Sequence, residues 1–217
     1  MSKKKIIIVD YRLGNLFSVE QACRHVGLDA KISDKKEDLE AADGLLLPGV
    51  GAFHEAMNNL EDLDLIAPIM KSVESGIPLF GICLGQQLLF TESEEFGTRK
   101  GLNFIPGKIK KFPVQNEQGE RVKVPQIGWN KLQHVAELQS TPLRSLNSDS
   151  FMYFVHSYYV VPEHPENTLT TTNYEGLNYS SSVKGKNNIF ATQFHPEKSG
   201  EPGLSIYRNW AEINNLI

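Results

Sequence analysis

The sequence predicts an α/β fold, with a mostly parallel central sheet flanked by helices and additional β-strands in the second half of the chain. Over the first hundred residues, short apolar runs alternate with helical patterns. Residues 6–9 and 45–47 lack polar alternation, as expected for central strands that are covered on both faces. After about residue 90 the pattern changes to strands separated by turns. Helices should therefore cover both faces of the sheet formed by the first half.

The first half is expected to form a βαβ series. Leu16, Val19, Cys23 and Val26 recur at helical spacing, so Cys23 lies on the apolar stripe of a helix and is expected to be an inert core thiol. The expected elements, in order, are a strand at residues 5–10, a helix at 15–26, strands at 30–33 and 44–47, helices through Met57 and Ile69, a strand at 78–82 and a short helix at 84–90.

The second half is richer in strands and ends in a helix. Residues 116–119 and 185–188 have the composition of hairpin turns. No internal repeat or linker-like stretch divides the chain, so residues 1–217 are expected to form a single domain. The expected elements are strands at residues 108–114, 121–124, 152–161, 169–172, 178–183 and 189–194, and a closing helix at 201–216.

Composition and charge exclude several classes of protein. The chain has 40% hydrophobic and 22% charged residues, as an ordinary globular protein does, and a formal charge of -4. That charge provides no positive field for nucleic acid or an anionic membrane. The basic segment at residues 1–5 is followed by an apolar run that Asp10 cuts short, too early for a secretory signal or a membrane span. A cytoplasmic location is therefore expected.

The cysteine content indicates neither a disulfide framework nor a cysteine-rich zinc site. Cys23 and Cys83 are the only two cysteines and are far apart in the sequence. Both thiols are expected to be reduced.

Cys83 has the sequence context of a nucleophile elbow. An apolar strand reaches Cys83, glycines stand two positions before and after it, and a helical pattern follows. The glycines permit the sharp turn of the related G-x-S-x-G arrangement. The dipole and free N–H groups of the following helix favour a thiolate and can face a developing oxyanion. The alternative is a buried structural cysteine at the end of a strand.

His195 and Glu197 lie two residues apart at the end of a predicted strand. In extended backbone they face the same side, and Pro196 favours extended geometry at His195. Glu197 could then bind one imidazole nitrogen while the other faces a thiol, as in hydrolytic triads. Alone, such a pair is usually a surface pair, so the interpretation depends on Cys83.

A third segment, residues 46–53, runs from a central strand through Gly49 and Gly51 into a helix. Such a turn lets backbone amides approach a ligand and could supply oxyanion donors, although a plain tight βα turn has the same pattern. No G-K-[ST] sequence follows the glycines, so a phosphate loop is not indicated.

Together, these segments resemble the class I glutamine amidotransferase family in its G-x-C-x-G elbow, its H-P-E end and its P-G-x-G loop, and the resemblance covers nearly the whole chain. Three further stretches resemble the glutaminase subunits of imidazole glycerol phosphate synthases within that family. They are Asp10-Tyr11 with Gly14-Asn15-Leu16, Gly128-Trp129-Asn130, and residues 153–158.

The resemblance implies a flavodoxin-like fold and a catalytic triad that needs no cofactor or metal. Cys83 would attack the side-chain amide of glutamine, and His195, oriented by Glu197, would move a proton onto departing ammonia before water hydrolyses the thioester. The implied oxyanion donors are the backbones of Val50, Gly51 and Leu84. The implied substrate-binding residues are Gly49, Gln87, Glu95, Ser157 and Tyr158, and the implied partner side carries Tyr153 and Lys198.

The resemblance also implies a partner. The ammonia would pass to a (β/α)₈-barrel synthase subunit in a heterodimer, which makes imidazole glycerol phosphate and an aminoimidazole carboxamide ribonucleotide in histidine biosynthesis. Turnover should then depend on that partner. An alternative is a glutaminase serving a sugar amidotransferase in surface-polysaccharide synthesis. Gln126 stands where the histidine-pathway members often have His, and Gln86 where they often have Met. Neither residue belongs to the implied triad, and both are expected near the substrate or partner side.

Alternatives from other classes are a catalytically idle regulatory subunit, a thiol peptidase on a similar sheet, and a zinc site built from Cys83, His195 and Glu197. A solvated strand face is expected for Lys108, Lys110 and Lys111, and structural roles for the other histidines. Of these histidines, His25 is expected on a helix, His54 after the glycine loop, His134 and His164 in loops, and His156 within a strand.

Overall fold

The computed structural model describes residues 4–147 and 150–217. Residues 1–3, which belong to the basic segment at the start of the chain, lie outside the described residues, as do residues 148–149. Among the described residues, no helix is long and apolar enough to span a membrane.

The first half forms the expected βαβ series. Its elements are β1 (Ile6–Val9), α1 (Leu16–His25), β2 (Ala30–Ser33), α2 (Lys36–Glu40), β3 (Gly44–Gly49), α3 (Phe53–Asp62), α4 (Ile66–Glu74), β4 (Leu79–Cys83) and α5 (Leu84–Leu88). The side chain of Asn15 caps α1 by accepting from the N–H of Ser18 at 3.3 Å. The helix α2 is an addition to the prediction, because its five residues are too few to show a helical period.

The second half is mostly β-structure. Its elements are β5 (Phe90–Ser93), β6 (Arg99–Lys100), β7 (Ile105–Lys111), β8 (Gln126–Lys131), β9 (Gln133–His134), β10 (Phe151–His156), β11 (Tyr158–Pro162), η1 (Pro165–Asn167), β12 (Thr168–Tyr174), β13 (Leu177–Lys184), β14 (Ile189–Thr192), η2 (Pro196–Lys198) and α6 (Gly200–Ile213).

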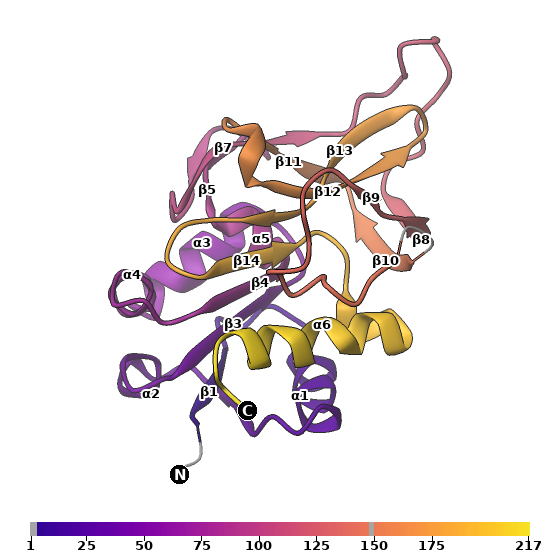
Figure 1. Ribbon diagram of the computed structural model, residues 1–217. Coiled ribbons are helices and arrows are strands. Elements are labelled where there is room, and N and C mark those ends of the chain that lie inside the picture. The colour runs from indigo at the N-terminus through magenta and orange to yellow at the C-terminus, as the bar shows by residue number, and fades with distance from the viewer. Residues whose placement is uncertain (1–3, 148–149) are drawn as a thin grey trace.

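One large mixed sheet runs through the described chain in the order β2-β1-β3-β4-β14-β13-β11-β7-β5-β6. The first five strands are parallel, and β14, late in the sequence, is inserted next to β4. From β13 to β7 the pairing is antiparallel. The strands β8 and β10 form a separate antiparallel pair at one side of the molecule, as Figure 1 shows. The fold is therefore the predicted mostly parallel α/β sheet with extra strands in the second half.

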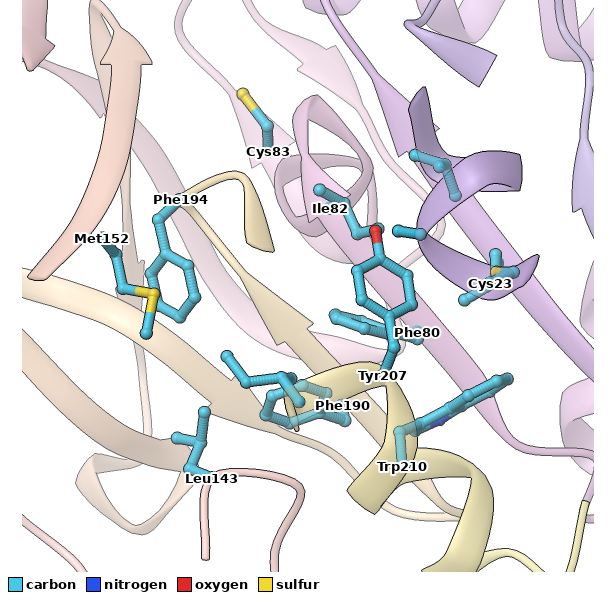
Figure 2. Packing of buried hydrophobic residues seen from close by; sticks show 14 of the residues in the cluster. Cys23, Phe80, Ile82, Cys83, Leu143, Met152, Phe190, Phe194, Tyr207 and Trp210 are labelled. Atoms are coloured by element: carbon cyan, nitrogen blue, oxygen red, sulfur yellow. The ribbon is translucent and has the colours of Figure 1, made fainter. Parts of the chain in front are cut away.

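Two apolar layers cover the parallel strands. The helices α1 and α6 pack on one face, where Phe80, Phe190 and Trp210 meet (Figure 2). The helices α2, α3, α4 and α5 pack on the other. Because successive side chains of a strand point to opposite faces, Ile6 and Ile8 belong to the first layer and Ile7 to the second. Because both faces of these strands are buried, their sequences are uninterrupted apolar runs.

Cys23 behaves as predicted. Its side chain is fully buried in the α1 layer, and this burial, helped by the charge of Glu20, raises the pKa of the thiol to about 12. The two predicted turns are also present. The N–H of Asn116 donates to the carbonyl of Glu120 at 2.9 Å, and that of Gly185 to the carbonyl of Ile189 at 3.0 Å.

Three predicted elements from residue 84 onward differ from the structure in extent or type. The strand expected at residues 152–161 is two strands in different sheets, divided at Ser157. Residues 121–124 carry only an isolated bridge to Gln115, whereas β8 follows them unpredicted. The helix expected to reach residue 90 ends at Leu88, because Phe90 already pairs in the sheet. His134, expected in a loop, lies in β9.

Candidate active site

Cys83 sits at a strained turn between β4 and α5. Its backbone has φ +56 and ψ −109, a left-handed conformation that a non-glycine residue adopts at a cost of about 1–3 kcal/mol. The flanking glycines make room for this turn. A Cβ on Gly85 would lie 1.6 Å from the carbonyl oxygen of Leu47, and one on Gly81 would lie 3.0 Å from the carbonyl oxygen of Gly85. The turn raises Cys83 above the end of the sheet, as Figure 2 shows.

His195 and Glu197 form a buried pair just after β14. Imidazole Nδ1 lies 2.7 Å from the Oε1 of Glu197, and the two side chains are only 2% and 1% exposed. The extended geometry expected for the pair is wrong, because Pro196–Lys198 is a 3₁₀ turn. His195 itself is extended, and the turn after it carries Glu197 back to the ring.

The other imidazole nitrogen is directed at Cys83. Nε2 of His195 is buried, and Cys83 is its interaction partner. Burial lowers the pKa of His195, but the charge of Cys83, hydrogen bonding with Cys83 and Glu197, and the charge of Glu197 outweigh it and raise the pKa to about 10. The contacts with Cys83 and Glu197 therefore favour the protonated form of the imidazole.

Replacement of Cys83 by alanine is expected to lower the pKa of His195. Burial persists in the variant, whereas the negative partner on the Nε2 side is lost. The pKa can be measured by NMR as the pH titration of the imidazole Cε1–H signal, assigned by its absence in His195→Asn. Cys23→Ala is the matched control and should leave the titration unchanged. An unchanged pKa in Cys83→Ala would show that the two side chains are not paired.

A cavity of about 750 Å³ opens over Cys83. Of the residues expected to act at the site, the cavity is lined by Val50, Gly51, Cys83, Leu84, Gln87, Glu95, Ser157 and Tyr158. Gly49 does not line it but pairs with Cys83 across β3 and β4. The hydroxyl of Tyr11 fills the space beside Gly49, where a Cβ would be only 1.9 Å from it. Gly49 therefore leaves room for the hydroxyl of Tyr11. As the last residue of β3, it also places Val50 next to the nucleophile.

The expected oxyanion donors border the cavity next to the nucleophile. Gly51 has φ +105, which a glycine accepts readily, and Val50 is partly exposed. Leu84 is the first residue of α5, so its N–H is free of intrahelical bonds. The three backbones can present donors to an oxygen bound close to Cys83.

The cavity carries charges of both signs. Glu95 is nearly buried, and its Oε2 accepts from the N–H of Phe53 at 2.6 Å, at the start of α3. Lys111 and Arg121 also line the cavity, and both are exposed. A zwitterion such as a free amino acid meets groups of both signs in this space.

Gln193 is a site residue that the sequence analysis did not identify. It is fully buried, its Nε2 lies 3.8 Å from the Sγ of Cys83, and its Oε1 accepts from the Nε2 of Gln87 at 3.1 Å. The same nitrogen of Gln87 also donates to the carbonyl of Tyr158 at 3.0 Å. A polar residue directly after an apolar strand and two positions before His195 is the signal that could have found it.

Tyr153 and Lys198, expected on a partner side, do not line the cavity but lie together beside it. The ammonium of Lys198 is 5.9 Å from the ring centroid of Tyr153, and Trp129 packs edge-on against that ring with centroids 5.9 Å apart. No group of three or more His, Cys, Asp and Glu side chains in the described chain is placed to hold a metal ion.

Comparisons with known proteins agree on one family. The model of the family "Glutamine amidotransferase class-I" matches residues 7–212. The chain is 46% identical over 209 residues to the imidazole glycerol phosphate synthase subunit HisH of Syntrophotalea carbinolica, covering 96% of this chain and 100% of that protein. It is 47% identical over 212 residues to the HisH subunit of Methanosarcina mazei, covering 97% and 99%.

Solved structures share the fold at lower identity. A putative GMP synthase subunit from Thermoplasma acidophilum matches with a TM-score of 0.70 at 21% identity, covering 99% of this chain and 96% of that one. PurLQS from Thermotoga maritima matches with a TM-score of 0.72 at 18% identity, covering 97% and 99%.

Proposed function

This chain belongs to the class I glutamine amidotransferase family, and we propose that it is the glutaminase subunit of an imidazole glycerol phosphate synthase in histidine biosynthesis, with Cys83, His195 and Glu197 as its catalytic triad. The relatives with that name match over nearly the whole chain. The catalytic assignment depends on one observation: the buried His195–Glu197 pair interacts with Cys83, whose backbone is strained.

The reaction follows from this geometry. The sulfur of Cys83 attacks the side-chain amide carbon of glutamine, and the carbonyl oxygen becomes an oxyanion that the N–H groups of Leu84, Val50 and Gly51 can stabilise. Protonated His195 gives its proton to the amide nitrogen, and the C–N bond breaks to release ammonia and leave a thioester. Neutral His195 then takes a proton from water, whose oxygen attacks the thioester and releases glutamate and the thiol.

Substrate recognition is assigned to the cavity walls. Glu95 is suited to the α-ammonium group of glutamine, since its carboxylate is nearly buried and has one oxygen held by Phe53. Gln87, Ser157 and Tyr158 surround the same space and supply amide and backbone groups. The side chain of glutamine would then point to Cys83 at the floor.

The partner is a synthase subunit, and we propose that it is a (β/α)₈ barrel that receives ammonia directly. Ammonia that escapes to neutral water is mostly protonated and loses its nucleophilicity, so a closed passage preserves it. The outer face of β8 and β10 is the proposed docking face. Its side chains Ile127, Trp129 and Phe151 are about half exposed or more and adjoin Tyr153 and Val155. Contiguous apolar side chains of this kind mark protein interfaces.

A sugar amidotransferase is the alternative partner that the residues at positions 126 and 86 raised in the sequence. Gln126 lies on the inner face of β8, and Gln86 is fully buried in α5 without lining the cavity. Neither side chain lies on the proposed docking face, so neither residue bears directly on which partner docks there.

Addition of a histidine-pathway barrel subunit is expected to raise glutamate release from glutamine strongly, and Trp129→Glu is expected to weaken that response. A central interface aromatic typically contributes about 2 kcal/mol or more, so the variant should need about 30-fold more partner for half-maximal activity. The measurement is glutamate release as a function of partner concentration.

The matched control is Val161→Glu, which changes an exposed apolar side chain of β11 that is not on the docking face. It should respond as the wild type does. Stimulation by a sugar amidotransferase alone would retain the chemistry and reassign the pathway. Equal partner dependence of Trp129→Glu and the wild type would place the interface elsewhere.

A further inference from the structure

A chain of buried polar side chains leads from the glutamine cavity to strand β8. His156 Nδ1 lies 2.9 Å from the carbonyl oxygen of Tyr158, and its Nε2 lies 3.2 Å from the hydroxyl of Tyr179. That hydroxyl is 2.9 Å from the side-chain amide of Gln126, which in turn bonds the side chain of Asn130 at 2.8 Å. Four consecutive contacts therefore join β11, β10, β13 and β8.

The Tyr158 carbonyl is the end of this chain at the cavity. It accepts from His156 and also from Nε2 of Gln87 at 3.0 Å, so both of its lone pairs are in use. The carbonyl of the preceding residue, Ser157, accepts a hydrogen bond from the N–H of Phe112 at 3.1 Å. The position of this cavity wall therefore depends on the imidazole of His156.

The imidazole of His156 in turn depends on Tyr179. Burial lowers the pKa of His156 to about 3, so the ring is neutral and has a single N–H. A carbonyl oxygen can only accept, which places that proton on Nδ1 and leaves Nε2 in need of a donor. The hydroxyl of Tyr179 is that donor. Its proton lies toward Oε1 of Gln126 in the structure, and a hydroxyl has only one proton. Donation to His156 therefore requires the amide of Gln126 to turn over, so that its N–H donates to the oxygen of Tyr179.

Tyr179 and Gln126 do not touch the substrate space. His156 lines the cavity, but Tyr179 and Gln126 are buried behind it. The ring of Tyr179 packs edge-on against Phe112 and His156, with centroids 5.4 Å and 5.3 Å apart. Their influence on a bound molecule must act through His156 and the Tyr158 carbonyl.

We propose that Tyr179 and Gln126 are positioning residues of the glutamine pocket, which hold His156, the Tyr158 carbonyl and thereby Gln87 in place. The proposal rests on the proposed glutaminase function. The network touches the walls that bind glutamine directly, and it reaches Cys83 only through two further contacts, from Gln87 to Gln193 and from Gln193 to the sulfur. It should therefore set the KM for glutamine and leave the chemistry of the thiol unchanged.

Tyr179→Phe tests this inference, because it removes the hydroxyl and keeps the ring. In the complex with the synthase subunit, the KM for glutamine is expected to rise about tenfold with kcat within about twofold of wild type, as loss of one buried hydrogen bond would produce. On the isolated full-length chain, alkylation of Cys83 by iodoacetamide, a small electrophile that needs no glutamine pocket, should keep its wild-type rate.

Tyr174→Phe is the matched control. Its hydroxyl donates to the carbonyl of Lys123 at 2.7 Å and its ring also packs on Phe112, but it is not a member of the polar chain that includes His156. It loses the same group from the same aromatic cluster and should keep the wild-type KM. His156→Asn, which retains a side-chain N–H donor near Tyr158, should raise the KM less than His156→Leu.

The outcomes separate the inference from the function on which it rests. A wild-type KM in Tyr179→Phe, or an equal rise in Tyr174→Phe, would overturn the positioning role while glutamine hydrolysis stands. Slower alkylation of Cys83 in Tyr179→Phe would overturn it too, since the effect would then lie in the thiol. Absence of Cys83-dependent glutamate from the wild-type complex would overturn the proposed function itself, and the inference with it.

Discussion

Cys83→Ala is expected to lower glutamate release in the synthase complex by about 10⁴-fold or more, the usual consequence of removing an activated nucleophile. Neither His195 nor the cavity backbone can replace the sulfur, because the acyl intermediate is a thioester and Cys23 is buried in the α1 layer. The measurement is glutamate production from glutamine by wild type and variant at equal partner concentration.

Two controls make the result specific. The synthase reaction driven by added ammonium salt should proceed normally with the variant, since it bypasses the thiol. Cys23→Ala should retain glutaminase activity, because Cys23 is buried in the α1 layer away from the cavity. Substantial Cys83-independent hydrolysis would exclude the proposed triad, and the idle regulatory subunit would follow if the wild type were also inactive.

Gly85→Ala is expected to be the most destabilising single methyl addition at the site. The new Cβ would lie 1.6 Å from the carbonyl oxygen of Leu47. That oxygen belongs to the backbone of β3, and Gly85 belongs to α5, so no flexible side chain can move to relieve the clash. Leu47 pairs with Gly81 in the sheet, so the clash can be relieved only by shifting α5 or separating β3 from β4. Overpacking usually costs about 1–3 kcal/mol, and a backbone clash of this size should cost about 3 kcal/mol or more.

For a chain of this length, that loss corresponds to a melting temperature lower by about 6–12 °C. Glutaminase activity should fall as well, because displacement of α5 moves the N–H of Leu84 and the turn at Cys83. The measurements are thermal unfolding by circular dichroism and the rate of glutamate release.

Gly119→Ala is the informative comparison for Gly85→Ala. Gly119 has φ +79, which an alanine adopts at a cost of about 1–2 kcal/mol, but no atom lies within 4 Å of the added Cβ. It should lower stability modestly and leave activity unchanged. If the two alanine variants had equal melting temperatures, packing of α5 on β3 would not be what requires glycine at position 85.

The first half of the fold was predictable because its local signals agree. The strands β1, β3 and β4 are buried on both faces, so they are continuous apolar runs, and the intervening helices carry clear apolar stripes. The second half was less predictable. Residues 152–161 alternate as one strand does. They are divided because β10 pairs with β8, whereas β11 pairs with β7 and β13.

The polar network was not predictable either. Gln193, Tyr179 and Gln126 lie in or next to strands, where a polar residue usually faces water. Here they are buried because each finds a partner from an element distant in the sequence: Gln87 of α5 for Gln193, His156 of β10 for Tyr179, and Tyr179 of β13 for Gln126. A pattern of side chains along one strand contains no information about such partners.

By itself, the sequence determined the sharp turn at Cys83, since the glycines on either side permit it locally, and it determined that Glu197 stays within reach of His195. Only the tertiary structure decided that these two segments meet. The strand β14, which precedes His195, lies parallel to β4, with Thr192 in register with Ile82. Parallel strands need a long connection, and their order in a sheet depends on how whole layers pack, which the period of any one segment does not specify.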